Sequence, residues 1–337
     1  MFQTKKLDST TKTKNSYVNG YGSFDLKMAI RDQRFLLLLI IVVIAIVVGS
    51  LNPRFLGIQN IVAIFQQISV QGVLTMAMAI LLLSGGIDLS IGNIMILAGI
   101  VMSKMLISGI EVGPTVLTGI AVAVGCGLLN GVIIAKSRCM PLIISLGMSG
   151  IYFGASLLLS EGKFMSFSQA FEGLRILRLF EVIPVTLFIF LFMVIIASIM
   201  VNRTKFGRRI VAIGGNEENA FLSGIKVDSY KIACYTISGL YCGIGSILYA
   251  SRLDSITAAG GSGYELTALT GAIIGGITFD GGKGTILGAF FGVIFMGIIT
   301  NAMTVLNINT YIQEIVSGAI IVAAIIISNY NNTRARI

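Results

Sequence analysis

The chain has 337 residues, of which 55% are hydrophobic and 12% are charged, and its net charge is +9. Soluble domains carry about 25% charged residues, so this composition indicates helices that face lipid. Because histidine is absent, a histidine proton relay, catalytic base or metal site is excluded. No cofactor is expected, and no nucleic-acid partner is predicted, because the positive charges lie beside apolar segments.

The two ends of the chain are polar. Residues 1–34 are rich in lysine, threonine and asparagine, which predicts a mostly disordered tail rather than a secretory signal peptide. Residues 329–337 form a second short polar tail. Everything between them, 35–328, is predicted to be one transmembrane domain.

Ten apolar segments are candidate membrane spans, since a bilayer core requires about 20 apolar residues per helix. The eighth is short and rich in glycine, so nine or eleven spans remain possible. The segments are 35–51, 58–84, 89–109, 114–136, 141–160, 182–201, 231–250, 266–280, 284–304 and 311–328.

Positive charges are distributed unequally between the loops. With the N-terminus inside, 18 of the 24 Lys and Arg residues fall on the cytoplasmic side and six on the other. By the positive-inside rule, this predicts a multi-pass protein of the bacterial inner (plasma) membrane with both termini in the cytoplasm.

The predicted cytoplasmic loop 202–230 opens with a basic cluster, followed by Gly214 and Gly215 in a predicted turn. Asn216 is a favourable N-cap, and two glutamates follow in the first turn, where the helix dipole favours acids. Gly224 is a natural residue to end the helix. The predicted two-turn helix is too short to be stable alone. We expect it to dock either on its own membrane domain or on a cytoplasmic partner.

Several polar residues fall inside apolar segments, where such residues are candidates for function. Asp88 follows two glycines, so it either caps a new helix or lines a pathway beside a broken helix. Asn93, Asn130 and Asn301 either bond between helices or face the same pathway.

Glycine-rich stretches carry three further predictions. Segment 275–284 lacks the spacing of a phosphate-binding loop, which favours a tight turn with an ion pair between Asp280 and Lys283. Glycines at helical spacing, at 150 and 154 and again from 271 to 292, predict tight helix crossings within one subunit or between two. The likeness of 85–87 to 275–277 raises the possibility of a duplicated half-domain.

Several of these motifs, taken together, resemble those of ribose-type permeases of ABC importers, a family that includes galactose, xylose and autoinducer permeases. The resemblance extends over about residues 55–328, and Asp280 departs from it, because a small or hydroxyl residue is expected there. The matching segments are 85–92, 214–218, 222–225, 264–266, 275–276 and 281–284.

The resemblance implies an all-α fold of about ten transmembrane helices, in the vitamin-B12-importer-like (type II) architecture. It further implies that a separate cytoplasmic ABC ATPase receives the loop helix in a cleft. The chain itself is then not an enzyme, and it lacks a Walker A motif. The residues implied to contact the ATPase are Gly215, Asn216, Glu217, Glu218, Ala220 and Gly224.

The other implied partners are a periplasmic or lipid-anchored substrate-binding protein, a second permease copy and membrane lipid. The expected cargo is a small polar solute, in particular a monosaccharide such as ribose. The alternative is an ion-coupled secondary transporter, which needs a buried ion site; Asp88 and Glu314 are its candidate ligands.

Overall fold

The computed structural model describes residues 33–180 and 182–334, and these are mostly helical. The longer helices match the predicted spans in order and approximate position. The helices are α2 (Gln33–Leu51), α3 (Ile58–Leu83), α4 (Ile91–Ile107), α5 (Val112–Ser137), α6 (Pro141–Ser160), α7 (Glu172–Ile176), α8 (Val185–Arg203), α9 (Lys205–Gly215), α10 (Glu217–Leu222), α11 (Val227–Leu253), α12 (Tyr264–Ile274), α13 (Ile286–Val305) and α14 (Thr310–Arg334), with short 3-10 helices η1 (Pro53–Leu56) and η2 (Ala258–Gly261).

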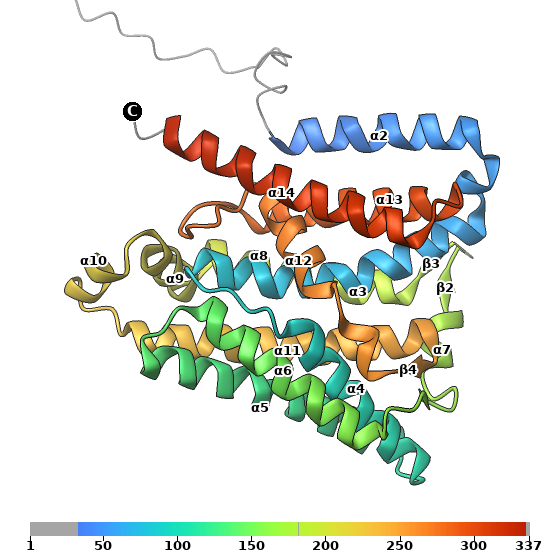
Figure 1. Cartoon of the computed structure of the whole chain (residues 1–337), viewed down its shortest axis with the longest axis horizontal. Coiled ribbons are helices and arrows are strands. Elements are labelled where there is room, and N and C mark those ends of the chain that lie inside the picture. Colours follow the sequence, from blue (N-terminus) through green and yellow to red (C-terminus); the bar gives the residue numbers. More distant parts are fainter. Residues whose placement is uncertain (1–32, 181, 335–337) are drawn as a thin grey trace, which may run out of the picture.

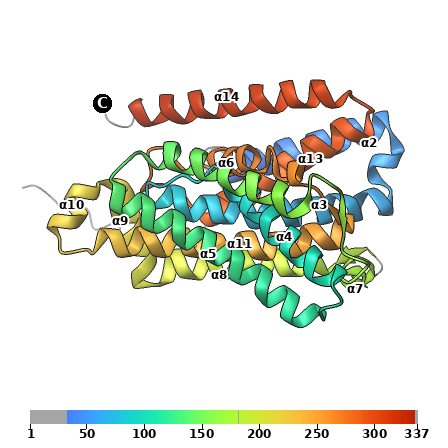
Figure 2. The same cartoon turned by 60° about the horizontal axis from the view of Figure 1, so that its bottom comes forward.

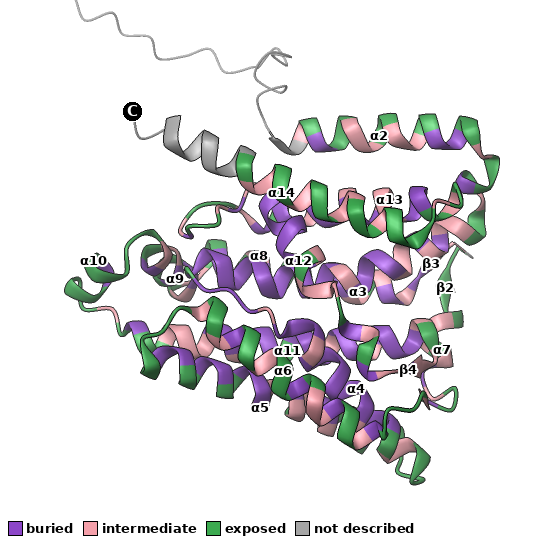
Figure 3. Cartoon of the chain, in the orientation of Figure 1, coloured by how far each residue is buried: buried purple, intermediate pink, exposed green. Residues whose placement is uncertain are grey.

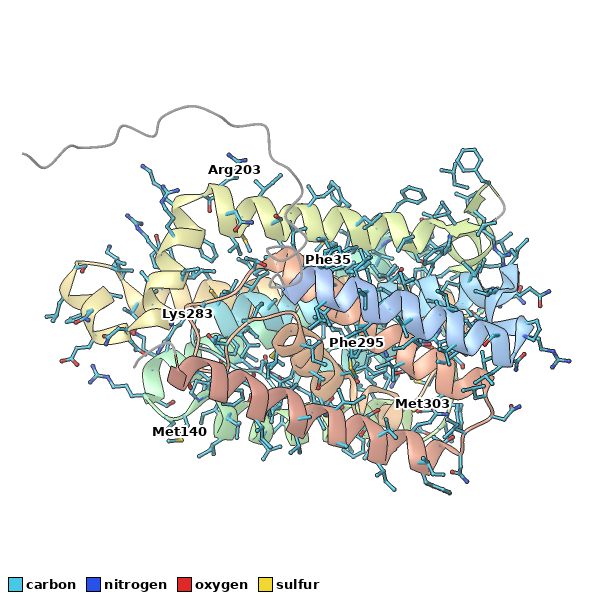
Figure 4. All side chains as sticks on the ribbon, turned by 90° about the horizontal axis from the view of Figure 1, so that it is seen from above. Phe35, Met140, Arg203, Lys283, Phe295 and Met303 are labelled. Atoms are coloured by element: carbon cyan, nitrogen blue, oxygen red, sulfur yellow. The ribbon has the colours of Figure 1, made fainter. Side chains whose placement is uncertain are left out.

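The long helices run roughly along one direction (Figures 1 and 2). Helices α9 and α10 project from one end, which we call the α10 end, and α7 lies at the opposite end. Two small antiparallel pairs also lie at the opposite end: β1 (Met165–Ser166) with β4 (Ser255–Ile256), and β2 (Arg178–Leu179) with β3 (Ile183–Pro184). Figure 4 shows Arg203 and Lys283 toward the α10 end and Met303 toward the other.

Six of the described helices are long and apolar enough to cross a membrane: α3, α5, α6, α8, α11 and α13. Shorter apolar stretches lie in α2, α4 and α14. The predicted span over 266–280 is wrong in its second half, because α12 ends at Ile274. Gly276 is left-handed there, and its amide and that of Ile277 bond back to the last turn. With 11 residues, α12 rises about 16 Å, roughly half of a bilayer core.

Helix α3 forms the centre of the bundle. In the most apolar stretch of 18 residues of α3, 72% of the residues are buried, whereas only 17% are buried in the corresponding stretch of α6. Figure 3 shows this difference. Every residue from Val73 to Leu83 is fully buried, because α8, α11, α12 and α13 all pack around α3. The last turns of α3 are therefore held on every side.

Glycines allow α12 and α13 to approach at backbone distance. A Cβ atom at Gly288 would lie 1.9 Å from the carbonyl oxygen of Gly275, and one at Gly292 would lie 1.9 Å from that of Gly271. This stripe therefore packs within one subunit. On α6, by contrast, Gly150 and Gly154 have no described atom within 4 Å of a built Cβ, so that face has no packing partner in the described part of the subunit.

Candidate functional site

The predicted loop helix forms as α10, and both of its ends are capped as the sequence indicates. The Asn216 side-chain oxygen accepts a hydrogen bond from the Asn219 amide at 2.8 Å. At the other end Gly224 has a φ of +79°, and the Ile225 amide donates to the Ala220 carbonyl at 3.1 Å. This is the Schellman arrangement, which requires a left-handed residue at the position of Gly224.

The side chains of α10 divide between two surroundings. Ala220 is buried against Ile213 and Val227, so one side of the helix docks on its own subunit. Phe221 and Leu222 point away and are 68% and 74% exposed. A six-residue helix that presents two large apolar side chains to solvent has the character of a contact surface for another molecule.

The two glutamates of α10 also differ. Glu217 forms an ion pair with Lys231 at 2.6 Å, which holds it against α11 of the same subunit. Glu218 is exposed and has no ion pair among the described residues. Of the two carboxylates, Glu218 is therefore the one free to meet a partner.

Helix α9 is a feature that the sequence did not predict. Thr204 caps it by accepting a hydrogen bond from the Gly207 amide at 3.2 Å. The predicted turn at Gly214 and Gly215 is wrong, because both residues belong to the last turn of α9. The available signal was the apolar spacing of Ile210 and Ile213, which are both buried.

The end of α9 meets two other glycine-rich segments, and we call this meeting point the glycine junction (Leu83–Gly85, Gly214–Gly215 and Gly281–Gly282). A Cβ at Gly214 would lie 2.2 Å from the Leu83 carbonyl oxygen and 2.7 Å from the Gly282 nitrogen. The Gly282 amide donates to the same Leu83 oxygen at 3.3 Å. Three segments that are distant in sequence therefore touch through backbone atoms.

The turn between α12 and α13 supplies the third part of the junction. The Thr278 amide donates to the Lys283 carbonyl at 3.1 Å, and the Thr278 hydroxyl donates to the Gly281 carbonyl at 3.0 Å. The predicted tight turn is confirmed. The predicted ion pair is not, since Asp280 and Lys283 form none with each other or with any described residue.

From the junction, α3 gives way to an extended segment that contains Asp88. Asp88 is fully buried, and one carboxylate oxygen accepts from the Ser90 amide at 2.8 Å and the Ser90 hydroxyl at 2.5 Å. The other accepts from the Asn130 amide group at 3.0 Å. The capping role considered from the sequence is wrong, because the N-cap residue of α4 is Ser90, whose own side chain caps no amide. Asp88 instead bonds to Ser90 in the turn before the helix and joins the start of α4 to α5.

Two tyrosines extend this polar cluster. Tyr152 donates to the Asn130 side-chain oxygen at 2.8 Å, and Tyr235 donates to the carbonyl of Ile87 at 2.9 Å. The extended segment is therefore anchored by side chains from α5, α6 and α11. Hydrogen bonding on this scale holds irregular backbone in place where no ladder partner exists.

Both α4 and α12 begin near the middle of the bundle (Figure 1), and their first residues meet. A Cβ at Gly92 would lie 2.4 Å from the Gly261 carbonyl oxygen and 2.8 Å from a carboxylate oxygen of Glu265. Beside Gly92, Asn93 donates to the Ser149 hydroxyl at 2.8 Å. Discontinuous helices whose N-termini point into the bundle are a recurrent way to build solute sites in transporters.

The four predicted pathway residues thus fall into two groups. Asp88, Asn93 and Asn130 lie together around the start of α4, whereas Asn301 pairs with Asn60 through two hydrogen bonds of 2.9 and 3.0 Å. Glu265 is a further candidate that sequence reasoning passed over. It is half-buried and without an ion pair among the described residues. The signal was an acid directly before an apolar segment.

Comparison with known proteins places these features in a family. The family model for the branched-chain amino acid transport system / permease component matches residues 60–325. The chain is 33% identical to the ribose import permease protein RbsC of Escherichia coli (strain K12) over 310 residues, which are 90% of this chain and 95% of the relative.

Two further relatives carry other names. The chain is 33% identical to the D-allose transport system permease protein AlsC of E. coli (strain K12), covering 85% of this chain and 88% of the relative. It is 32% identical to the L-arabinose transport system permease protein AraH of the same strain, covering 89% and 92%. No solved structure matches the chain. These matches confirm the resemblance seen in the motifs: the chain belongs to the permease-component family of ABC importers, whose ATP hydrolysis is performed by a separate subunit.

Proposed function

We propose that the chain forms the translocation pathway of an ABC importer for a monosaccharide. The support for the sugar is that similar permeases are named for ribose, allose and arabinose. In this proposal an ATPase subunit binds at the α10 end, a periplasmic or lipid-anchored binding protein delivers the solute at the other end, and a second permease copy completes the pathway.

The observation that carries the proposal is the construction of α10. One side is fixed to its own subunit by Ala220, while Phe221 and Leu222 stand exposed, and Glu218 adds a carboxylate that pairs with no cation in the described part of the chain. An apolar pair beside an acid suits a groove with an apolar floor and a basic rim. We assign the same contact to Gly215, Asn216, Glu217 and Gly224, which frame the helix.

The α10 end is proposed to be cytoplasmic, together with both termini. Basic residues gather in its loops, and membrane proteins concentrate such residues on the cytoplasmic side. The ten helices at the predicted spans would then pass alternately through the membrane in a type II arrangement, with α12 entering as a half-helix. The basic residues of this end include Lys136, Arg138, Arg203, Lys205, Arg208, Arg209, Lys226, Lys231 and Lys283.

The glycine junction supplies the proposed route from the ATPase to the pathway. Movement of α10 shifts the end of α9, and Gly214 there touches the ends of α3 and of the α12–α13 turn. Both segments lead to the place where α4 and α12 begin. We propose that the pathway passes this place and continues along the unpartnered glycine face of α6, against the second copy.

Within that pathway, Glu265 is proposed to accept hydrogen bonds from solute hydroxyls and Asn93 to exchange them, since both residues are only half-buried. Asp88 and Asn130 are proposed to shape the pathway by holding the segment before α4, and Asn301 to line it on the side of α13. Glu265→Gln is expected to lower uptake while leaving ATP hydrolysis by the assembled transporter intact.

The docking role of α10 is tested by Glu218→Lys in the complete transporter, reconstituted with its ATPase and binding protein. Charge reversal at the contact is expected to abolish ATP-driven uptake and solute-stimulated ATP hydrolysis without changing membrane insertion. The matched control is Glu111→Lys, which reverses the charge of an exposed residue at the opposite end and is expected to leave ATPase binding unchanged. Normal ATPase binding by the Glu218→Lys transporter would refute the assignment.

A second assay separates this function from ion-coupled transport. Vesicles that contain the chain without any ATPase are expected to show no uptake when a proton or sodium gradient is imposed. Robust gradient-driven uptake by the chain alone would overturn the proposal.

A further inference from the structure

A pocket at the α10 end lies outside the pathway and outside the exposed face of α10. It has a volume of about 440 Å³ and opens between α9, the segment that follows α10, and the first turns of α11. We call it the α9–α11 pocket. The side chains that matter below are those of Phe206, Arg209, Lys226, Ser229 and Tyr230.

The pocket is positively charged, because its cations are not neutralised by neighbouring acids. Asp228 pairs with Lys136 at 3.4 Å, and Glu217 pairs with Lys231. Neither Arg209 nor Lys226 has a carboxylate within 4.0 Å among the described residues. Two cations therefore face one cavity with their charge available to a ligand.

Arg209 is held in a fixed position by an aromatic pair. Its guanidinium lies 5.5 Å from the centre of the Tyr230 ring and donates a hydrogen bond to the Tyr230 hydroxyl. The Tyr230 ring in turn packs on Phe206 at 5.5 Å. A guanidinium held this way keeps its other N–H groups for an acceptor, and its planar fork suits the oxygens of a phosphate.

The other side chains that line the pocket are also suited to binding a phosphate group. The Ser229 hydroxyl is exposed and donates to anionic oxygens. The Tyr230 hydroxyl accepts from Arg209, so its own hydrogen is available to a ligand. Phe206 and Ala233 add apolar wall. A volume of this size holds more than a bare phosphate, and α8 leads directly from an apolar span to the mouth at α9.

We propose that the α9–α11 pocket binds the phosphodiester of an anionic phospholipid headgroup. Anionic headgroups of the cytoplasmic leaflet attract basic residues at the ends of membrane spans, so the inference rests on the proposed cytoplasmic placement of the α10 end. Gly224 and Ile225 form one wall of the pocket, so a bound headgroup braces the segment that carries α10.

The test measures which lipid the purified full-length chain retains. The chain is equilibrated with an equal mixture of phosphatidylglycerol and phosphatidylcholine in detergent, and bound lipid is counted by native mass spectrometry. Each basic residue near an anionic headgroup contributes about a fivefold preference. The Arg209→Gln/Lys226→Gln variant is therefore expected to lose about 30-fold of the preference for phosphatidylglycerol.

Lys205→Gln/Arg208→Gln is the matched control, because it removes two exposed charges of the same loop that do not line the pocket. It is expected to change the preference by no more than about fivefold. If both variants lost the preference for phosphatidylglycerol equally, the lipid would be attracted by the overall positive charge of the loop and not by the pocket, and the proposal would be overturned. Displacement of phosphatidylglycerol by inorganic phosphate at equal concentration would show a soluble phosphate site and would overturn the lipid assignment.

Discussion

Gly214→Ala probes the glycine junction, because this position allows no side chain. The added Cβ would lie 2.2 Å from the Leu83 oxygen, 2.7 Å from the Gly282 nitrogen and 2.9 Å from the Gly85 nitrogen. Ordinary contacts of this kind are longer than 3.4 Å. All three neighbours are backbone atoms, so none can turn aside. The segments must separate by about 1 Å.

The cost to stability is expected to be small. Overpacking costs about 1–3 kcal/mol, and alanine is about 1 kcal/mol more favourable than glycine in a helix. The variant therefore loses about 0–2 kcal/mol and should still insert and assemble. Solute transport should be reduced more than stability, because the displaced contact is the proposed route by which the ATPase is coupled to the pathway.

Coupling free energies of about 1–3 kcal/mol correspond to about 5- to 150-fold effects. We expect Gly214→Ala to lower solute uptake per ATP hydrolysed by at least about fivefold, measured in proteoliposomes containing the complete transporter. Gly125→Ala is the control, because a Cβ at this helical glycine would have no atom of the described residues within 4 Å outside its own helix backbone. Unchanged uptake per ATP in Gly214→Ala, or an equal loss in Gly125→Ala, would refute the coupling role of the junction.

Three further substitutions test the packing of the subunit. Asp88→Asn should lower the free energy of unfolding by about 1–3 kcal/mol, because the new amide places a donor against the amide of Asn130; a thermal melt in detergent checks this, and an unchanged midpoint would contradict the cluster. Gly288→Ala should destabilise by about 0–2 kcal/mol, since overpacking of about 1–3 kcal/mol is offset by about 1 kcal/mol of helix propensity, and it should lower the yield of folded protein, measured by size exclusion. Asn301→Leu should cost about 1–3 kcal/mol, because the Asn60 side-chain oxygen loses its donor and only the bond from Asn60 to the Phe55 carbonyl remains. Asn60→Leu/Asn301→Leu should recover part of this loss, and additive losses would contradict the pairing.

The parts of the structure that follow from local chemistry were predictable. Asn216 and Gly224 bracket α10 because an amide side chain and a left-handed glycine satisfy the free backbone groups at the two ends of a short helix. The apolar spans are likewise marked by length and composition alone. Their limits follow the sequence to within a few residues, except that α12 ends early at Ile274 and α14 continues beyond residue 328 to Arg334.

Contacts between distant segments were not predictable in the same way. The junction joins Leu83, Gly214 and Gly282, and nothing near any one of them specifies the others. The Gly214–Gly215 pair indicated a turn, because a weak helix with two glycines at its end depends on tertiary packing for its stability. The likeness of 85–87 to 275–277 does not extend to the backbone, since the left-handed glycine is the first of the pair at Gly85 and the second at Gly276.

Backbone contact at the junction bears on how the proposed motion is transmitted. Side chains that meet across an interface can change rotamer and absorb a displacement, whereas Gly214, Gly85 and Gly281 have no side chains to do so. A shift of α9 must therefore move the end of α3 or the turn before α13. The end of α3 is enclosed on every side, so the strain passes more readily into the extended segment after Gly85. That segment is anchored at Asp88, so in the proposed mechanism the displacement is passed on to the start of α4, where Gly92 meets Gly261.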